Sequence, residues 1–315
     1  MPEFVNCKNV RFSPLMLGTV QLGLNYGISN LDGLPEVEKS IQLLDQAMSL
    51  GINTLDTARA YGQSEEVISR FLKKRTPELP VNIISKFVID NQNRDLESIW
   101  NQVEESVRKS LQILQLPKLT GCLFHRSLTN NLDVLVGILP EIFNRLKESG
   151  LVDRTGFSAF SPDDIKYILE IPNVEIVQLP FNVFDQRMLV AGYLRDLKKR
   201  NILVVARSVF LQGLFFMNPD SLPEELAEAA PHIRKLHEFS ARYNISLAQV
   251  AIVFVRDQPD IDCLVLGALN SQQVSEIVEL FQAPKLTGEQ MKILNDQFPV
   301  DNKLIITPAY WPAKK

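Results

Sequence analysis

The sequence predicts an α/β protein that folds as a (β/α)8 barrel, and three observations lead to that fold class. Eight short apolar segments alternate with longer amphipathic segments along the 315 residues. Several apolar segments are continuous, as in strands that are buried on both faces of a parallel sheet. An eightfold strand–helix alternation favours a closed barrel over an open doubly wound sheet. No shift in composition marks a linker, so we expect residues 1–315 to form a single domain.

The strands expected in the barrel are short apolar runs that each precede a helical pattern. They cover residues 15–20, 52–55, 81–84, 120–124, 154–157, 175–179, 202–206 and 263–266. Two further β-like segments, Phe4–Cys7 and Val10–Phe12, come before the first of these strands. We expect the two segments to pair across Lys8 and Asn9 as a short N-terminal hairpin.

The helices between the strands are predicted from apolar residues at helical spacing. Ser161 and Pro162 start one helix as a cap residue and a first-turn proline, and Gly51 and Gly150 each end another. Besides the helix that starts at 161, we expect helices over residues 37–48, 64–72, 96–114, 133–149, 186–199, 231–243, 247–256 and 271–281.

Composition argues against several classes of function. The formal charge is −4, from 33 basic and 37 acidic residues, without the basic patch of a protein that binds nucleic acid or a membrane surface. No apolar run approaches the roughly 20 residues that span a bilayer. The N-terminus lacks a signal peptide, and three distant cysteines resemble the reduced thiols of a cytoplasmic protein. His232 and His237 lack ligand spacing, so no metal site is expected.

Residues capable of acid–base chemistry end three neighbouring strands of the predicted barrel. Asp56 ends the second strand and Tyr61 follows five residues later, while Lys86 and His125 end the third and fourth strands. The carboxyl ends of barrel strands meet at one mouth, where barrel enzymes carry their active sites. We therefore expect these four side chains to lie close together.

These four residue types can together reduce a carbonyl group. A phenol has a reference pKa of about 10, and a nearby ammonium group favours the phenolate. Asp56 can pair with Lys86 and keep it charged, and a neutral His125 can donate a hydrogen bond to a carbonyl oxygen. The group would polarise the carbonyl and deliver a proton while a hydride arrives from a cofactor.

Over most of its length, the sequence resembles the aldo-keto reductases, in particular the bacterial type. The similarity rests on the segments LMLGTVQLG, LDTARAYGQSE, ISKF, LFHRS, GFSAF, VQLPFNV, ARSVFLQG and LGALNSQQVSEIV. It implies a barrel oxidoreductase that uses NADP or NAD without a metal. It also implies that Asp56, Tyr61, Lys86 and His125 are catalytic, with Tyr61 as the general acid and base.

The resemblance further implies which residues bind the cofactor. Ser158 and Gln178 correspond to positions that hold the nicotinamide carboxamide, although Ala159 stands where asparagine is usual. Arg207 occupies the approximate place of an aromatic residue that stacks on the nicotinamide. The full set expected at the cofactor is Gly18, Thr19, Ser158, Gln178, Arg207, Ser208, Gly213, Gly267, Ala268, Gln273 and Glu276.

The segment from Gly267 to Gln273 lacks the lysine or arginine with which many relatives grip the 2′-phosphate of NADP. Each lost charge-assisted hydrogen bond is worth roughly 1.5–3 kcal/mol. Weakened selectivity for NADP is therefore expected, although backbone amides at a helix start can still bind a phosphate.

The sequence leaves the substrate open. Tyr26, Arg126 and Trp311 are the expected substrate-binding residues and would suit the carbonyl form of a polyol or sugar. The leading hypothesis is a cytoplasmic NAD(P)-dependent oxidoreductase that interconverts an aldehyde or ketone and its alcohol, as a monomer or weak homo-oligomer. Two alternatives remain: a cofactor-binding regulatory subunit with little turnover, as in potassium-channel β-subunits, and an epimerase that uses a bound nicotinamide cofactor transiently.

Overall fold

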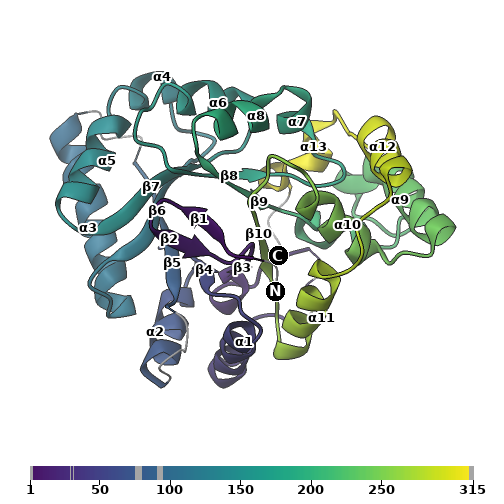
Figure 1. Cartoon of the computed structure of the whole chain (residues 1–315), viewed down its shortest axis with the longest axis horizontal. Coiled ribbons are helices and arrows are strands. Elements are labelled where there is room, and N and C mark those ends of the chain that lie inside the picture. The colour runs from purple at the N-terminus through teal and green to yellow at the C-terminus, as the bar shows by residue number, and fades with distance from the viewer. Residues whose placement is uncertain (1–2, 29, 31, 75–79, 91–94, 312–315) are drawn as a thin grey trace.

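The computed structural model describes residues 3–28, 30, 32–74, 80–90 and 95–311, and it confirms the predicted barrel (Figure 1). Eight parallel strands close into a barrel in the order β10-β3-β4-β5-β6-β7-β8-β9. The strands are β3 (Leu15–Gly18), β4 (Thr54–Asp56), β5 (Asn82–Phe87), β6 (Leu119–His125), β7 (Val152–Ser158), β8 (Ile176–Pro180), β9 (Leu203–Arg207) and β10 (Cys263–Gly267).

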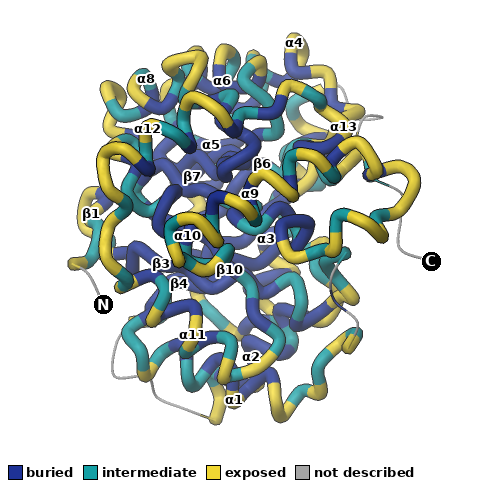
Figure 2. The backbone as a smooth tube through the Cα atoms, turned by 90° about the vertical axis from the view of Figure 1, so that its right-hand side faces the viewer, coloured by how far each residue is buried: buried dark blue, intermediate teal, exposed yellow. Residues whose placement is uncertain are grey.

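Helices surround the barrel and bury their apolar faces against it. Figure 2 shows the buried backbone at the centre and the exposed backbone towards the outside. The α-helices are α1 (Val37–Ser49), α2 (Ser64–Lys74), α3 (Leu96–Leu114), α4 (Leu132–Leu135), α5 (Leu139–Glu148), α6 (Pro162–Ile168), α7 (Arg187–Val190), α8 (Tyr193–Lys199), α9 (Ala230–Tyr243), α10 (Leu247–Arg256), α11 (Ser271–Phe281), α12 (Gly288–Gln297) and α13 (Lys303–Ile306). Short 3-10 helices are η1 (Val20–Leu22), η2 (Leu211–Phe216), η3 (Glu224–Ala229) and η4 (Pro308–Tyr310).

Two predicted helices are divided in the structure. The helix expected over 133–149 forms α4 and α5, because Pro140 lies in the first turn of α5 and cannot continue a helix from before it. The helix expected over 186–199 forms α7 and α8, which are separated by Gly192 with a φ of +77°. Helix α12 was not predicted from the sequence, and its start is fixed by a capping box between Thr287 and Gln290.

The predicted N-terminal hairpin is confirmed and covers the end of the barrel where the strands begin. Strands β1 (Val5–Cys7) and β2 (Val10–Phe12) pair antiparallel, and Figure 1 shows them across the barrel opening. Asn53 and Asn82, at the starts of β4 and β5, both donate to the carbonyl oxygen of Arg11. Phe12 is fully buried against the interior of the barrel, so the hairpin closes that end.

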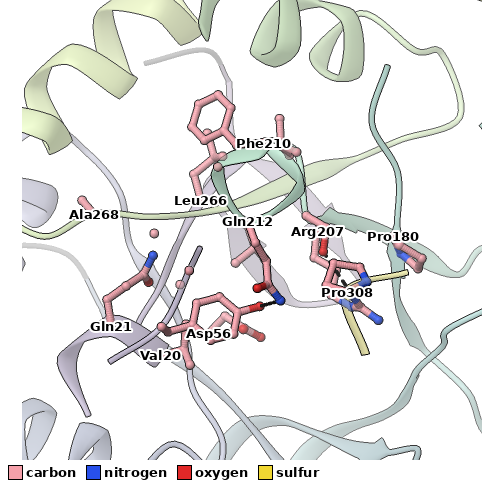
Figure 3. A pocket seen from close by; sticks show the side chains of 18 of the residues that line it. Val20, Gln21, Asp56, Pro180, Arg207, Phe210, Gln212, Leu266, Ala268 and Pro308 are labelled. Carbon is pink, nitrogen blue, oxygen red and sulfur yellow. Dashed lines mark hydrogen bonds between the residues drawn. The ribbon is translucent and has the colours of Figure 1, made fainter. Parts of the chain in front are cut away.

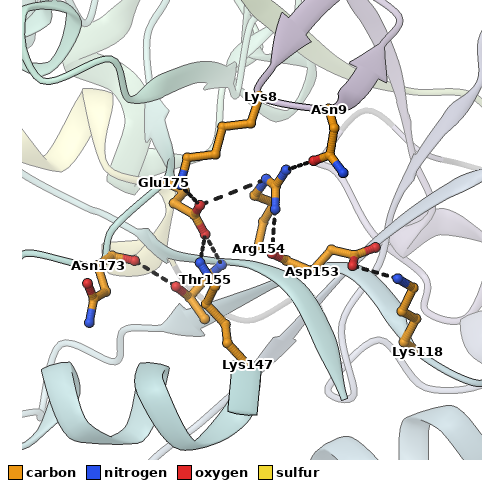
Figure 4. A network of polar contacts seen from close by, with 9 residues as sticks. All are labelled: Lys8, Asn9, Lys118, Lys147, Asp153, Arg154, Thr155, Asn173 and Glu175. Atoms are coloured by element: carbon orange, nitrogen blue, oxygen red, sulfur yellow. Dashed lines mark hydrogen bonds and ion pairs between the residues drawn. The ribbon is translucent and has the colours of Figure 1, made fainter. Parts of the chain in front are cut away.

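A network of charges fastens the hairpin to the barrel (Figure 4). Glu175 lies at its centre with only 8% of its side chain exposed. It pairs with Lys8 of the hairpin, with Lys147 Nζ at 2.9 Å and with Arg154 Nε at 3.9 Å. Burial would raise the pKa of Glu175, but hydrogen bonds from Lys8 and Lys147 outweigh burial and hold the pKa below its usual 4.5.

We expect Glu175→Gln to lower the free energy of unfolding by about 3 kcal/mol at pH 7, because it leaves Arg154 and Lys147 without a carboxylate. A depressed carboxyl pKa contributes stability at neutral pH that is lost as the pH falls below 4.5. The difference between variant and wild type should therefore shrink in acid. Urea unfolding at pH 7 and pH 4 measures it.

Lys8→Met provides the control for this experiment. The Lys8 side chain is 63% exposed, so its loss should cost less than about 1 kcal/mol. Equal losses in the two variants would contradict the central role of Glu175.

Candidate active site

A cavity of about 820 Å³ opens at the carboxyl ends of the barrel strands, the face where (β/α)8 enzymes carry their active sites. Asp56, Tyr61, His125 and Tyr26 line it. All eleven residues predicted to hold the cofactor also line it: Gly18, Thr19, Ser158, Gln178, Arg207, Ser208, Gly213, Gly267, Ala268, Gln273 and Glu276. Most of the predicted site residues therefore share one cavity.

Lys86 lies beneath the cavity wall with its side chain completely buried. Its Nζ donates to both carboxylate oxygens of Asp56 at 2.8 Å and to the backbone carbonyl of Thr57 at 2.8 Å. The same nitrogen donates to the Tyr61 hydroxyl at 3.3 Å. Three ammonium hydrogens thus serve four acceptors, and Lys86 is held under the phenol oxygen.

The surroundings keep Lys86 charged despite its burial. Burial alone would lower its pKa, but the Asp56 carboxylate and the Tyr61 phenol outweigh that effect, and the pKa lies above the usual 10.5. Gln178 Nε2 donates to Asp56 Oδ1 at 2.7 Å and so helps to fix the carboxylate. The ammonium consequently remains a cation throughout the neutral pH range.

A tight turn after β4 positions Tyr61. Gly62 has a φ of +54°, and a Cβ atom there would lie 2.2 Å from the carbonyl oxygen of Gly23, so the turn requires glycine. Lys86 Nζ lies 4.8 Å from the centroid of the Tyr61 ring. The His125 ring is perpendicular to that of Tyr61, with centroids 6.1 Å apart. Phenol and imidazole therefore lie next to each other at the cavity wall.

His125 is uncharged at neutral pH. Burial and the nearby cations Lys86 and Arg207 lower the pKa of the imidazole from 6.5 to about 3. A neutral imidazole has one N–H donor and one acceptor nitrogen. His125 can therefore donate a hydrogen bond to a ligand oxygen without competing with the phenol as an acid.

The polar contacts that support Asp56 and the end of β5 were not apparent from the sequence. Thr19 Oγ1 donates to the backbone carbonyl of Asp56 at 2.9 Å and accepts from Ser64 Oγ at 2.7 Å. Glu65 is fully buried and accepts from Ser85 Oγ at 3.0 Å. Ser64 and Glu65 both belong to the segment LDTARAYGQSE. Charged residues in the first turn of a helix usually face solvent, so the burial of Glu65 could not be predicted from the sequence.

Two loops meet beside the cavity. Gln212 Nε2 donates to the Tyr26 hydroxyl at 2.9 Å, and its backbone oxygen accepts from the Ile28 amide at 3.1 Å. Ser208, Leu211, Gln212 and Gly213 all have positive φ. Such left-handed residues curve a loop so that it can present backbone amides to an anion.

The opposite side of the cavity is formed by the start of α11 and carries no cation within the described segment 267–276. Asn270 caps α11 by accepting from the Gln273 amide at 2.9 Å, and Gln273 Oε1 accepts from the Leu269 amide at 2.8 Å. Glu276 is exposed and accepts from Gln272 Nε2 at 2.8 Å. The side chains here are neutral or acidic.

The residues around the cavity fit a nicotinamide dinucleotide. Gln21 Oε1 is buried on the cavity wall without a hydrogen-bond partner in the described part of the chain. A Cβ atom on Gly267 would lie 2.1 Å from that oxygen, so the glycine keeps the backbone open there. Figure 3 shows Gln21 and Ala268 on one side of the cavity, Arg207 and Pro180 on the other, and Asp56 between them. An extended ligand can therefore reach from α11 to the phenol.

Two of the three predicted substrate residues do not line the cavity. Arg126 Nε lies 3.1 Å from Asp164 Oδ1, next to the start of α6. Trp311 Nε1 donates to the carbonyl oxygen of Leu304 at 2.7 Å, which fixes the tail on α13. Asp164 is distant from Arg126 along the chain, and Leu304 is only seven residues before Trp311, but neither contact follows a regular helical or strand spacing that the sequence could reveal. Tyr26 does line the cavity.

Comparison with known proteins identifies the family. The model of the aldo/keto reductase family matches residues 14–297. An uncharacterized oxidoreductase of Bacillus subtilis is 27% identical and aligns over 90% of this chain and 96% of its own length. An NADH-specific methylglyoxal reductase of Escherichia coli is 24% identical and aligns over 86% of this chain and 90% of its own length. The holo form of an aldo-keto reductase from Bacillus halodurans superposes with a TM-score of 0.74 at 21% sequence identity. The superposition covers 95% of this chain and 97% of the other.

The chain belongs to the aldo/keto reductase family. Members of this family are oxidoreductases that act on small carbonyl compounds and generally use nicotinamide cofactors. Among the described residues, no three His, Cys, Asp or Glu side chains gather as metal ligands would. No helix in the described ranges is long and apolar enough to cross a membrane.

We expect His125 to make folding stability depend on pH. Its pKa is about 3 in the folded chain and 6.5 as the reference value, so the unfolded chain binds the extra proton between these values. Stability should therefore fall as the pH drops below 6.5, by up to about 2 kcal/mol at pH 5. Urea unfolding of wild type and His125→Gln at pH 7.5 and pH 5 measures this, and the variant should lose less. An equal loss would contradict a buried neutral imidazole.

Proposed function

We propose that this protein catalyses the reversible reduction of an aldehyde or ketone by a nicotinamide cofactor, with Tyr61 as the group that gives and takes the proton. The observation that carries the proposal is the 3.3 Å contact between Lys86 Nζ and the Tyr61 hydroxyl at the cavity wall. Because the lysine donates to the phenol oxygen, the phenol proton is free to point into the cavity. A carbonyl oxygen seated there would receive it.

Lys86 stabilises the phenolate that remains after proton transfer. The phenol loses its proton as negative charge develops on the substrate oxygen, and a fixed ammonium group favours that ionisation. Asp56 holds the ammonium in place through two contacts at 2.8 Å. In alcohol oxidation the same phenolate would accept the hydroxyl proton, so one arrangement serves both directions.

His125 orients the carbonyl group in this proposal. The neutral imidazole lies beside the phenol and would donate to the same carbonyl oxygen. Two donors directed at one oxygen polarise the carbonyl and fix its direction. The substrate carbon is thereby presented to the cofactor in a defined orientation.

A nicotinamide cofactor supplies the hydride, which no side chain can provide. Ser158 Oγ and the side-chain oxygen of Gln178 would hold its carboxamide, since Gln178 uses its nitrogen for Asp56. The loop from Ser208 to Gly213 would hold the pyrophosphate. The start of α11, with Gln273, would hold the adenosine end.

We also infer that NADH serves at least as well as NADPH. The cavity wall formed by residues 267–276 carries one carboxylate, Glu276. This segment contains no lysine or arginine that could neutralise a 2′-phosphate. The similarity to an NADH-specific methylglyoxal reductase supports this inference.

The proposed acid is tested with Tyr61→Phe. Loss of the phenol hydroxyl should lower kcat about 10²- to 10⁴-fold, while the Kd for NADH changes little. Oxidation of NADH at 340 nm with a panel of aldehydes, ketones and sugars measures turnover, and quenching of protein fluorescence measures binding. Tyr243→Phe removes a phenol hydroxyl outside the cavity lining and should leave turnover unchanged.

Full activity of Tyr61→Phe would refute the assigned role. Tight cofactor binding without turnover of any panel compound would instead favour a regulatory subunit.

The coenzyme inference is tested with Glu276→Lys. Replacing the exposed carboxylate by a cation should shift the ratio of kcat/KM values about 10-fold towards NADPH. Glu279→Lys makes the same charge change on α11 outside the cavity lining and should shift the ratio little. A wild-type preference of about a hundredfold for NADPH, or more, would contradict the inference.

A further inference from the structure

Arg207 is a cation at the catalytic side of the cavity that the proposed reaction does not require. It ends β9 and lines the cavity. Its guanidinium carbon lies 5.2 Å from the centroid of the Phe160 ring. Its charge contributes, after burial and Lys86, to the lowered pKa of His125, so the guanidinium lies within electrostatic reach of the imidazole.

The hydrogen bonds of Arg207 leave part of the guanidinium available. Nη2 donates to the carbonyl oxygen of Ala159 at 2.9 Å, and Nη1 lies 3.2 Å from Ser208 Oγ. A guanidinium group has five N–H donors, so these two contacts with described residues leave three. The Phe160 ring and the Ala159 carbonyl fix the plane of the group, which would therefore meet a ligand already oriented.

Among the described residues near Tyr61 and His125, one positive charge has no negative partner. Lys86 is neutralised by Asp56, and Arg187 by Asp185 at 2.8 Å. His125 is neutral at pH 7. Arg207 has no carboxylate partner in the part of the chain that the structure describes. A partly buried cation without a counter-ion favours an anionic ligand.

Besides Asp56, two acidic residues line the cavity, Asp32 and Glu276. Neither pairs with Arg207. Asp32 is exposed on the loop after β3. Glu276 lies on α11, and Ala268, three residues before that helix, is on the far side of Asp56 from Arg207 in Figure 3. The positive charge is therefore local to the region of the phenol and the imidazole.

We propose that the substrate is a carbonyl compound with an oxyanion group, a carboxylate or a phosphate, and that Arg207 binds this group beside Tyr61 and His125. The inference rests on the proposed carbonyl reduction and specifies its substrate class. It assigns Arg207 to the substrate rather than to stacking on the nicotinamide. A planar guanidinium pairs with two oxygens of either anion through parallel hydrogen bonds, which would give the substrate a fixed orientation.

Substrate pairs in which one member carries an anionic group and the other is neutral provide the test. D-Glucuronate is compared with D-glucose, and D-glyceraldehyde 3-phosphate with D-glyceraldehyde, so that the two pairs distinguish carboxylate from phosphate. The wild type should show a kcat/KM at least about 10-fold higher for the anionic member of one pair, the effect of one charge-assisted contact. Calorimetric binding of the same compounds to the protein saturated with NAD⁺ provides a readout without reduction.

Three variants separate the role of Arg207 from general charge effects. Arg207→Gln should lower the anionic-to-neutral ratio at least about 10-fold, and Arg207→Lys should retain part of it. Arg242→Gln removes an exposed cation outside the cavity lining and should leave the ratio unchanged. The Kd of NADH, measured by fluorescence for each variant, shows whether Arg207 serves the cofactor instead.

The proposal is overturned if the wild type prefers neither anion, if Arg207→Gln keeps the wild-type ratio, or if this variant weakens NADH binding as much as it weakens the anionic substrate. Turnover without charge preference would leave the carbonyl reduction standing and remove only this inference. Charge-selective binding without turnover of any compound would support the role of Arg207 and count against the proposed carbonyl reduction.

Discussion

Lys86 and Asp56 meet at 2.8 Å inside the barrel wall, where neither side chain has appreciable contact with solvent. A charge in such a place is stable only beside its partner, because separation would leave a bare ion in a medium of low polarity. The pair therefore fixes the ends of β4 and β5 relative to each other. The Tyr61 phenol, the Gln178 amide and the Thr57 carbonyl all take their positions from these two groups.

The two sides of the cavity next to this pair differ in charge. The side at Tyr61 and His125 has Lys86 paired with Asp56, an uncharged imidazole and the additional cation of Arg207. The side at α11 has no described cation on residues 267–276, and it exposes Glu276. An anionic ligand is therefore attracted more strongly towards the phenol than towards α11. In the proposed reaction, specificity for coenzyme and for substrate would thus arise from the two sides independently.

The fold could be predicted because its signals are local and repeated. Each apolar run followed by an amphipathic segment indicates one strand–helix unit, and eight units leave few alternatives to a barrel. Residues at strand ends converge for the same reason, which is why Asp56, Tyr61, Lys86 and His125 could be grouped without coordinates. Side-chain direction is not a local property. Arg126 faces Asp164 and Trp311 bonds to Leu304, and no sequence period encodes such contacts.

The interior of the barrel below the candidate active site is filled with packed side chains. Phe12 of the hairpin and apolar residues such as Met16, Ile84 and Leu123 fill it within the described part of the chain. Among the described residues, Tyr61 therefore meets solvent through the cavity at the rim and not through the barrel interior. In the proposed reaction, the Tyr61 phenolate left after proton transfer would regain its proton from that side, where the alcohol product would also be bound. Departure of the alcohol and renewal of the proton would then be linked events, because the hairpin closes the opposite end of the barrel.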